Sequence, residues 1–87
     1  MKILAKPINV IAVFNCAHAP IPRRFRYEDD SGETVEVTVD RITETEKQKL
    51  AGIESIIYRC QSVISGEAKL YELKYVISDY SWELYKM

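Results

Sequence analysis

One spacing in this chain could ligate a metal ion. Cys16 and His18 form a Cys-x-His pair, and Cys60 would add a third soft ligand. A closed zinc site needs four ligands, usually in tighter pairs, so these three do not complete one. The alternative is a loop cysteine, a loop histidine and a buried core thiol. We predict that alternative, with no metal site and no cofactor.

Residues arranged for catalysis are also absent. The chain has one histidine, and it has no glycine-rich phosphate loop, no Gly-x-Ser-x-Gly, no Cys-x-x-Cys and no His-Glu-x-x-His motif. Glu28, Asp29 and Asp30 cluster where a turn is expected, and acidic residues in turns are ordinarily solvated. This cluster lacks the full ligand set of a calcium loop. We predict that the protein is not an enzyme.

The stretch PRRFRYEDD has the composition of a strand that binds nucleic acid. Its arginines, Arg23, Arg24 and Arg26, interleave with Phe25 and Tyr27. Stacking on an aromatic ring contributes about 1–3 kcal/mol per base in single-strand binders. The formal net charge is −1, however, so the molecule as a whole does not attract polyanions. A nucleic-acid site would have to be a local patch.

Composition limits the class of protein. With 87 residues, of which 47% are hydrophobic and 29% charged, the chain is predicted to be one soluble globular domain, residues 1–87. The longest uninterrupted apolar run, Val10–Phe14, is shorter than the roughly 7–15 residues of a signal-peptide core. Two cysteines are too few for a disulfide framework. We therefore expect a cytoplasmic protein that has no membrane segment.

Apolar and polar residues alternate along nearly the whole chain, which is typical of β-strands. We predict strands over residues 7–15, 22–29, 34–41, 55–64, 69–77 and 81–86. The exception is residues 44–51, where Thr43 and Glu46 have capping-box spacing and Gly52 would end a short helix. The first strand is apolar on both faces, so it should be central or covered on both sides.

Turn residues predict the register of three hairpins. A three-residue loop ending at Gly32 predicts the pairs Phe25–Val37, Tyr27–Val35, Arg26–Glu36 and Arg24–Thr38. A two-residue loop at Ser65-Gly66 predicts the pairs Ile56–Tyr75, Tyr58–Leu73, Cys60–Tyr71 and Arg59–Glu72. The last turn predicts the pairs Ile77–Trp82 and Tyr75–Leu84. In this scheme most arginines face carboxylates of their own sheet.

The two apolar faces that result must bury against each other or close into a barrel. We predict an all-β, mainly antiparallel fold: a small five- to six-stranded curled sheet or barrel, OB-like or SH3-like, with one short helix. The tyrosines assigned to the core are Tyr27, Tyr58, Tyr71 and Tyr75. Tyr80 and Tyr85 are left outside.

The outer side of the last three strands is more apolar than a solvated face requires. Its apolar residues are Ile57, Leu70, Val76, Tyr85 and Met87, among the charged residues Arg59, Glu72 and Lys74. Either the short helix or the first strand covers this face, or a partner does. We favour cover from within the chain, because a small domain uses its own elements first.

Three stretches, KPINVIAVFN, PIPRRFRYED and the ending CQSVISGEAKLYELKYVISDYSWELYKM, resemble a small uncharacterised bacterial all-β family. The likeness runs from Lys6 to Met87 and includes no catalytic motif. Members of this family are often encoded near Y-family translesion DNA polymerases. The resemblance therefore implies at most an accessory role in DNA repair, and it gives Cys16 and His18 no support.

Together these observations predict a non-enzymatic β-barrel module that binds a protein or a single-stranded nucleic acid. The contact residues we predict are Arg23, Arg24, Arg26, Arg59, Lys74 and Tyr85. The alternative is a structural or homo-oligomeric protein that binds no nucleic acid, in which the outer apolar face or an unpaired edge strand meets its own copy.

Overall fold

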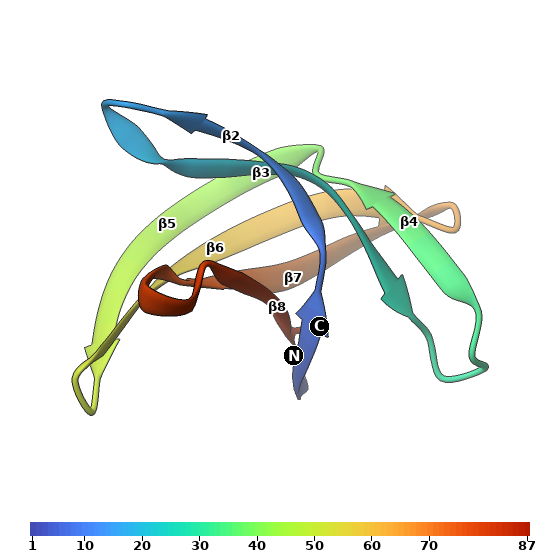
Figure 1. The fold of residues 1–87 in the computed structure, drawn as a ribbon. Helices are drawn as coiled ribbons and strands as arrows, with labels where there is room; N and C mark the ends of the chain where they lie inside the picture. Colours follow the sequence, from blue (N-terminus) through green and yellow to red (C-terminus); the bar gives the residue numbers. More distant parts are fainter.

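The computed structural model describes residues 1–87 as two antiparallel β-sheets (Figure 1). The strands are β1 (Ile3–Ile8), β2 (Val10–Asn15), β3 (His18–Glu28), β4 (Thr34–Thr38), β5 (Arg41–Leu50), β6 (Ile53–Ile64), β7 (Glu67–Val76) and β8 (Ser81–Lys86). One sheet has five strands in the order β1-β8-β7-β6-β5, and the other has three in the order β2-β3-β4. The all-β antiparallel class is confirmed. The expected five or six strands are in fact eight, and they form two sheets that do not close into a barrel.

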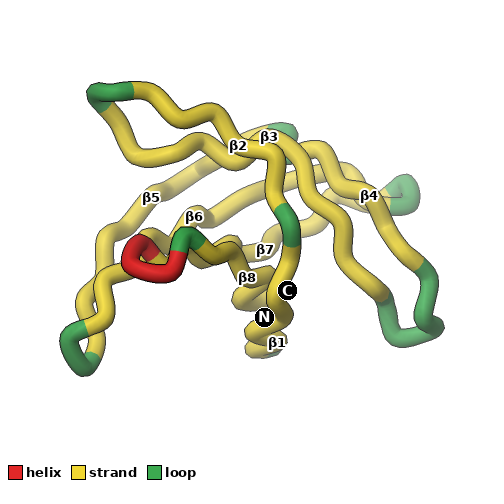
Figure 2. Tube along the Cα trace, viewed as in Figure 1, coloured by secondary structure: helices red, strands yellow, loops and turns green.

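The three-stranded sheet lies across the concave face of the curled five-stranded sheet, and the core lies between them (Figures 1 and 2). The buried core residues are Phe25, Val37, Ile56, Tyr58, Cys60, Ile64, Tyr71, Leu73, Tyr75, Trp82 and Leu84. Each strand sends alternate residues into this layer, because side chains point to opposite faces with a period of two. The predicted inner faces are therefore confirmed, and so is the assignment of four tyrosines to them.

Two of the predicted hairpin registers are confirmed at every predicted pair. In β3–β4, Phe25 lies opposite Val37 and Arg26 opposite Glu36, and Gly32 has a positive φ of 85° in the loop. In β6–β7 the observed pairs include Tyr58–Leu73, Cys60–Tyr71 and Arg59–Glu72. Turn chemistry and a one-sided apolar pattern were enough to define both registers, since a slip of one residue would turn the apolar face outward.

The predicted register of the last hairpin is wrong by two residues. Trp82 lies opposite Tyr75 instead of Ile77, and Leu84 lies opposite Leu73. The turn is longer than expected, because Ile77–Asp79 form a 3-10 turn that ends at Tyr80 in the left-handed conformation. A slip of two keeps every side chain on its own face, so Trp82 and Leu84 still enter the core.

The helix predicted over residues 44–51 is wrong, because this segment belongs to β5, which pairs with β6. Figure 2 shows helix only in the short turn before β8. Thr43 and Thr45 favour an extended backbone, and pairing along β6 outweighs the local capping pattern. Ala51 and Gly52, with φ of 51° and 82°, form a two-residue hairpin turn in which both residues are left-handed.

The first predicted strand is two edge strands instead of one central strand. The chain leaves the five-stranded sheet after Ile8 and enters the three-stranded sheet at Val10, with Asn9 between them. β1 pairs only with β8, and β2 pairs only with β3. The expected cover on both sides is therefore absent, and Ile11 on β2 is 65% exposed.

Replacing Ala51 with Gly tests the β5 assignment by the sign of its effect. A left-handed conformation costs an L-residue about 1–2 kcal/mol, so Ala51→Gly should raise the free energy of unfolding by about 1 kcal/mol in the observed hairpin. In a helix the same change would lower it by about as much. Urea unfolding followed by Trp82 fluorescence measures the difference. Gly52→Ala is the control and should destabilise; a destabilising Ala51→Gly would contradict the hairpin.

The buried acidic groups of the core predict a loss of stability at alkaline pH. Burial raises the pKa of Cys60 from 9.0 to about 12 and that of Tyr58 from 10.0 to about 12. The unfolded chain therefore releases protons above about pH 9 that the folded chain retains, so the free energy of unfolding falls as the pH rises. We expect a fall of about 2 kcal/mol or more between about pH 8 and pH 10.5. Urea unfolding at both values checks this, with Cys16→Ser as a control that keeps the slope; a flat profile would contradict it.

Candidate partner-binding site

The predicted contact residues fall into two groups on opposite outer faces of the molecule. One group, on β3 in the three-stranded sheet, consists of Arg23, Arg24 and Arg26. The other, on the outer face of the five-stranded sheet, consists of Arg59, Lys74 and Tyr85. Because the sheets pack by their inner faces, no single flat partner can contact both groups.

Arg24 and Arg26 share one carboxylate on the neighbouring strand. Arg24 Nη1 lies 3.4 Å and Arg26 Nε 3.5 Å from the two oxygens of Glu36. All three side chains are about half or more exposed, so each ion pair contributes at most about 1 kcal/mol to stability. The pairing predicted across this hairpin is present, and it reduces the positive charge that this face offers to a polyanion.

Arg23 has no carboxylate within ion-pair distance, as the hairpin pairing implies. The structure adds the reason for its position. Ile11 lies opposite Arg24 and Ala12 lies opposite Pro22, so Arg23 is the extra residue of a β-bulge. The bulge lets Pro22 and Phe25 both face the core while Arg23 stays exposed.

Arg59 is the centre of a network of ion pairs on the five-stranded sheet. Its Nε lies 3.2 Å from Glu72 Oε2, its Nη2 lies 3.6 Å from Glu46 Oε2, and its Nη1 binds Glu44. Hydrogen bonds to Glu44 and then to Glu72 raise the pKa of Arg59. Glu72 is only 5% exposed, so Arg59 is the cation that allows a carboxylate to remain buried there. Arg59 is thus occupied within its own sheet.

Lys74 and Tyr85 pack on each other on the same outer face. Lys74 Nζ lies 5.0 Å and Lys86 Nζ 5.2 Å from the centre of the Tyr85 ring, which is within cation–π range. The expected cover of this face by a helix or by the first strand is wrong, since β1 lies at the sheet edge beside β8. Ile57 is nevertheless buried, with Glu46 and Lys74 opposite it on the two flanking strands. Leu70 on this face remains exposed.

The side chains considered for a metal site lie in different surroundings. Cys16 is exposed in the turn between β2 and β3, where Asn15 Oδ1 accepts the backbone N–H of Ala17 and of His18. Cys60 is buried in the core.

The acidic cluster at Glu28, Asp29 and Asp30 shapes a turn: Asp29 Oδ1 accepts the backbone N–H groups of Ser31 and Glu33. The Ser31 hydroxyl also donates to Asp29 and lowers the pKa of that carboxyl.

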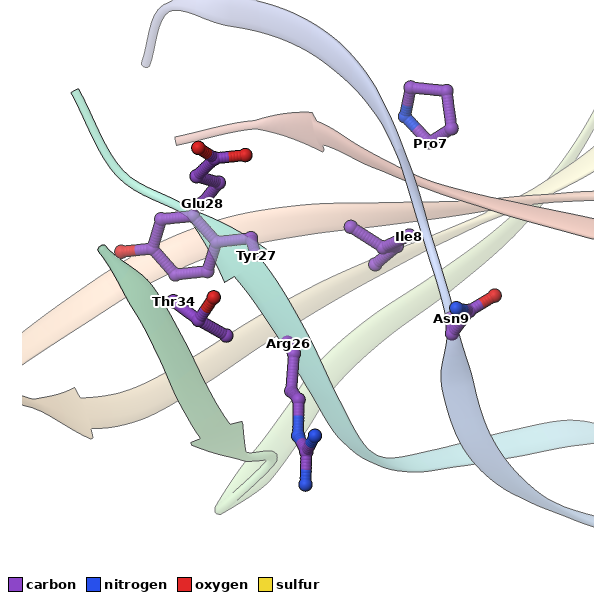
Figure 3. Close-up of a pocket in the computed structure, with 7 residues that line it drawn as sticks. All are labelled: Pro7, Ile8, Asn9, Arg26, Tyr27, Glu28 and Thr34. Carbon is purple, nitrogen blue, oxygen red and sulfur yellow. The ribbon is translucent and has the colours of Figure 1, made fainter. Parts of the chain in front are cut away.

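Two adjoining hollows flank the point where the chain crosses between the sheets. The first, of about 430 Å³, lies between the crossing segment Pro7–Asn9 and the residues Arg26, Tyr27, Glu28 and Thr34 (Figure 3). The second, of about 310 Å³, lies on the outer face of the three-stranded sheet and is lined by Asn9, Val10, Ile11, Arg24, Phe25, Arg26 and Glu36. Asn9 and Arg26 line both, so the hollows form one continuous surface with the predicted residues Arg24 and Arg26 on it.

No family model, curated protein or solved structure matches this chain. What the surfaces can bind must therefore be argued from their geometry. None of the helical segments is long and apolar enough to cross a membrane.

Sequence reasoning missed the exposed apolar residues of β2. Ile11 is 65%, Val13 43% and Phe14 63% exposed. The run from Val10 to Phe14 suggested a covered strand because its two-sided apolar character was taken for burial. Pro20 and Pro22 on the partner strand are the available signal, because a proline confines its part of a strand to a sheet edge, and residues 18–22 of β3 pair with β2 alone.

The different surroundings of the arginines predict different effects of removing their charge. Arg59→Gln should lower the urea midpoint clearly, because it leaves buried Glu72 without its cation. Arg24→Gln, the matched control, should change the free energy of unfolding by less than about 1 kcal/mol, because its ion pair is solvated. Equal effects of the two changes would show that Arg59 has no special structural role. The double variant Arg59→Gln with Glu72→Gln should recover part of the lost stability.

Proposed function

We propose that this protein is a non-enzymatic module that binds a protein partner through the outer face of its three-stranded sheet. The observation that carries the proposal is the exposed apolar pair Ile11 and Val13 beside two arginines that share the carboxylate of Glu36. An apolar centre with a polar rim is the composition of a protein–protein contact. The hollow next to Ile11 gives this face a concave feature that a partner's side chain could fill.

Charge favours a protein over a nucleic acid as the partner. Of the four arginines expected to contact nucleic acid, Arg24 and Arg26 pair with Glu36, and Arg59 pairs with three carboxylates. Affinity for nucleic acid comes mainly from cations that are free to replace counterions at phosphates. On the outer face of the three-stranded sheet only Arg23 is such a cation; on the other sheet Lys74 and Lys86 form no ion pair, and both lie over the Tyr85 ring.

A single-stranded nucleic acid is the second candidate, and Arg23 is the observation in its favour. Arg23 is exposed at a bulge and makes no ion pair. Arg41 and Lys69, which form no ion pair either, belong to the other sheet. One free arginine on the three-stranded sheet can support weak, salt-sensitive binding only.

The setting of the module is also part of the proposal. Two free thiols, Cys16 and Cys60, fit a reducing compartment, and we place the protein in the cytoplasm. The likeness to a family encoded beside translesion polymerases supports an accessory role in DNA repair. We retain OB-like or SH3-like as the proposed relationship of the curled sheet, because small β-modules of both kinds bind partners on strand faces.

Paired substitutions on the outer face test the proposal. Purified protein, immobilised and exposed to host extract, should retain a specific partner. The double variant Ile11→Thr, Val13→Thr should bind that partner at least about tenfold more weakly, which corresponds to about 1.4 kcal/mol. Thr keeps the strand propensity of this position. Val63→Thr is the matched control, because Val63 is also 65% exposed but lies on the five-stranded sheet. Equal retention by both variants would contradict the proposed face.

A titration of labelled single-stranded DNA at low salt separates the second candidate. We expect no binding. Binding that falls steeply with salt and is abolished by Arg23→Gln would replace the protein-binding proposal with the nucleic-acid one.

A further inference from the structure

We propose that a second copy of this chain pairs antiparallel along the free edge of β2, with a two-fold axis at Ala12. This inference goes beyond the proposed function, because it rests on the backbone edge of β2. Of the outer-face side chains it uses only Ile11 and Val13, which meet across the axis. It joins the two three-stranded sheets into one continuous sheet.

The direction of the backbone groups in β2 follows from its partner strand. The Tyr58 hydroxyl donates to the carbonyl oxygen of Pro20, so this carbonyl points away from β2 and towards β6. The other side of β3 gives the same direction. Asp29 N–H donates to Glu33 O and Val39 N–H donates to Arg23 O, so by alternation Phe25 directs its backbone groups to β4 and away from β2. Val10, opposite Phe25, therefore directs its own to the free edge, and alternation along β2 gives Ala12 the same direction. Pro22, opposite Ala12, thus faces away from β2, where its lack of an N–H is harmless.

Ala12 lies opposite Pro22 in the register of β2 and β3. When one member of an antiparallel pair directs its backbone groups away from the ladder, so does the other. The N–H and C=O of Ala12 therefore point to the free edge, and by alternation those of Val10 and Phe14 do too. The edge offers a row of unsatisfied donors and acceptors, which is a template for strand addition.

Self-pairing about Ala12 matches these groups with their own copies. Ala12 faces the partner's Ala12, and Val10 faces the partner's Phe14, all with backbone groups directed at each other. Ile11 faces the partner's Val13 on the outer side. Aromatic–β-branched and aliphatic cross-strand pairs are favourable ones. Phe14 makes an edge-to-face contact with Tyr75 of its own chain, with ring centres 6.1 Å apart.

Charge distinguishes the β2 edge from the other three sheet edges. β2, with the sequence VIAVFN, carries no charged side chain, so two copies meet without repulsion. β4 has Glu36 at its centre, which would face its own copy, and β5 carries Glu44, Glu46, Lys47 and Lys49. β1 contains Pro7 and a backbone irregularity at Ala5, whose φ is 48°. Charges and prolines are usual protections of an edge, and β2 has neither; the two register irregularities of its ladder place their extra residues on β3.

A proline at position 12 tests the pairing without touching the outer face. Ala12→Pro removes an N–H that points to the free edge and leaves the bonds to β3 in place, while Ala12→Ser is the matched control that keeps the N–H. Wild type and Ala12→Ser should show a concentration-dependent monomer–dimer equilibrium by sedimentation. Ala12→Pro should raise the dissociation constant at least about tenfold. A wild type that stays monomeric up to millimolar concentration overturns the proposal. So does an Ala12→Pro variant that is folded and still forms the dimer.

Cross-linking tests the register and still gives an answer if Ala12→Pro does not fold. In a Cys16→Ser background, Ala12→Cys brings two thiols to directly opposed positions about 5.5 Å apart between Cα atoms, which a disulfide can span. Val13→Cys places its two copies about 8 Å apart, beyond that range. Mild oxidation should yield covalent dimer from Ala12→Cys and little from Val13→Cys. The reverse result, or equal yields, overturns the proposed axis.

Ala12→Pro separates the two proposals, because Ile11 and Val13 belong to both surfaces while Ala12 belongs only to the edge pairing. Loss of the dimer leaves the outer-face partner testable with Ile11→Thr, Val13→Thr, and loss of that partner leaves the edge pairing of Ala12 testable by sedimentation. A host protein that adds its own strand to β2 would show as binding abolished by Ala12→Pro in a wild type that remains monomeric, which again overturns the second copy as the occupant.

Discussion

The packing of a three-stranded sheet onto the concave face of a five-stranded one is the constraint on which this molecule depends. The two sheets meet where Phe25 on β3 contacts Tyr71 on β7, with ring centres 5.5 Å apart. Tyr71 also shares a hydrogen bond with Ser62, and the Ser62 hydroxyl reaches the carbonyl of Thr38 on β4. A chain of 87 residues has little surface to bury, so one aromatic contact flanked by satisfied polar groups has a large share in closing the core.

The curled sheet also decides where the charges can go. With the inner layer filled by aromatic and aliphatic residues, every arginine must lie on an outer face, and strand pairing brings most of them to carboxylates. Arg59 shows the result most clearly, because β5 supplies Glu44 and Glu46 from one side and β7 supplies Glu72 from the other. The ion-paired arginines on these strands therefore serve the fold before they are available to any interface.

How much of this could be read from the sequence depended on the range of the interactions involved. The hairpins at Gly32 and Gly66 are local, so turn residues and a period of two predicted their pairs and the neutralisation of Arg24 and Arg26. The strand at residues 41–50 was mistaken for a helix because Thr43 and Glu46 satisfy a local capping pattern, whereas its pairing with β6 is a tertiary contact. The bulge at Arg23 and the added carboxylates of β5 at Arg59 were missed for the same reason: both depend on a strand whose position the local pattern did not reveal.

The exposure of β2 follows from the change of sheet at Asn9. Because the chain must leave the five-stranded sheet to cover its concave face, the segment that crosses over cannot be central in either sheet. An apolar strand placed at an edge is a hazard unless something covers it, and the other edges of this protein carry charges, a proline or a bulge. If none of the four sheet edges were protected, the exposure of β2 would need no separate explanation. The proposed pairing along β2 would cover the one edge that carries neither a charge nor a proline, and it would do so without requiring free cations.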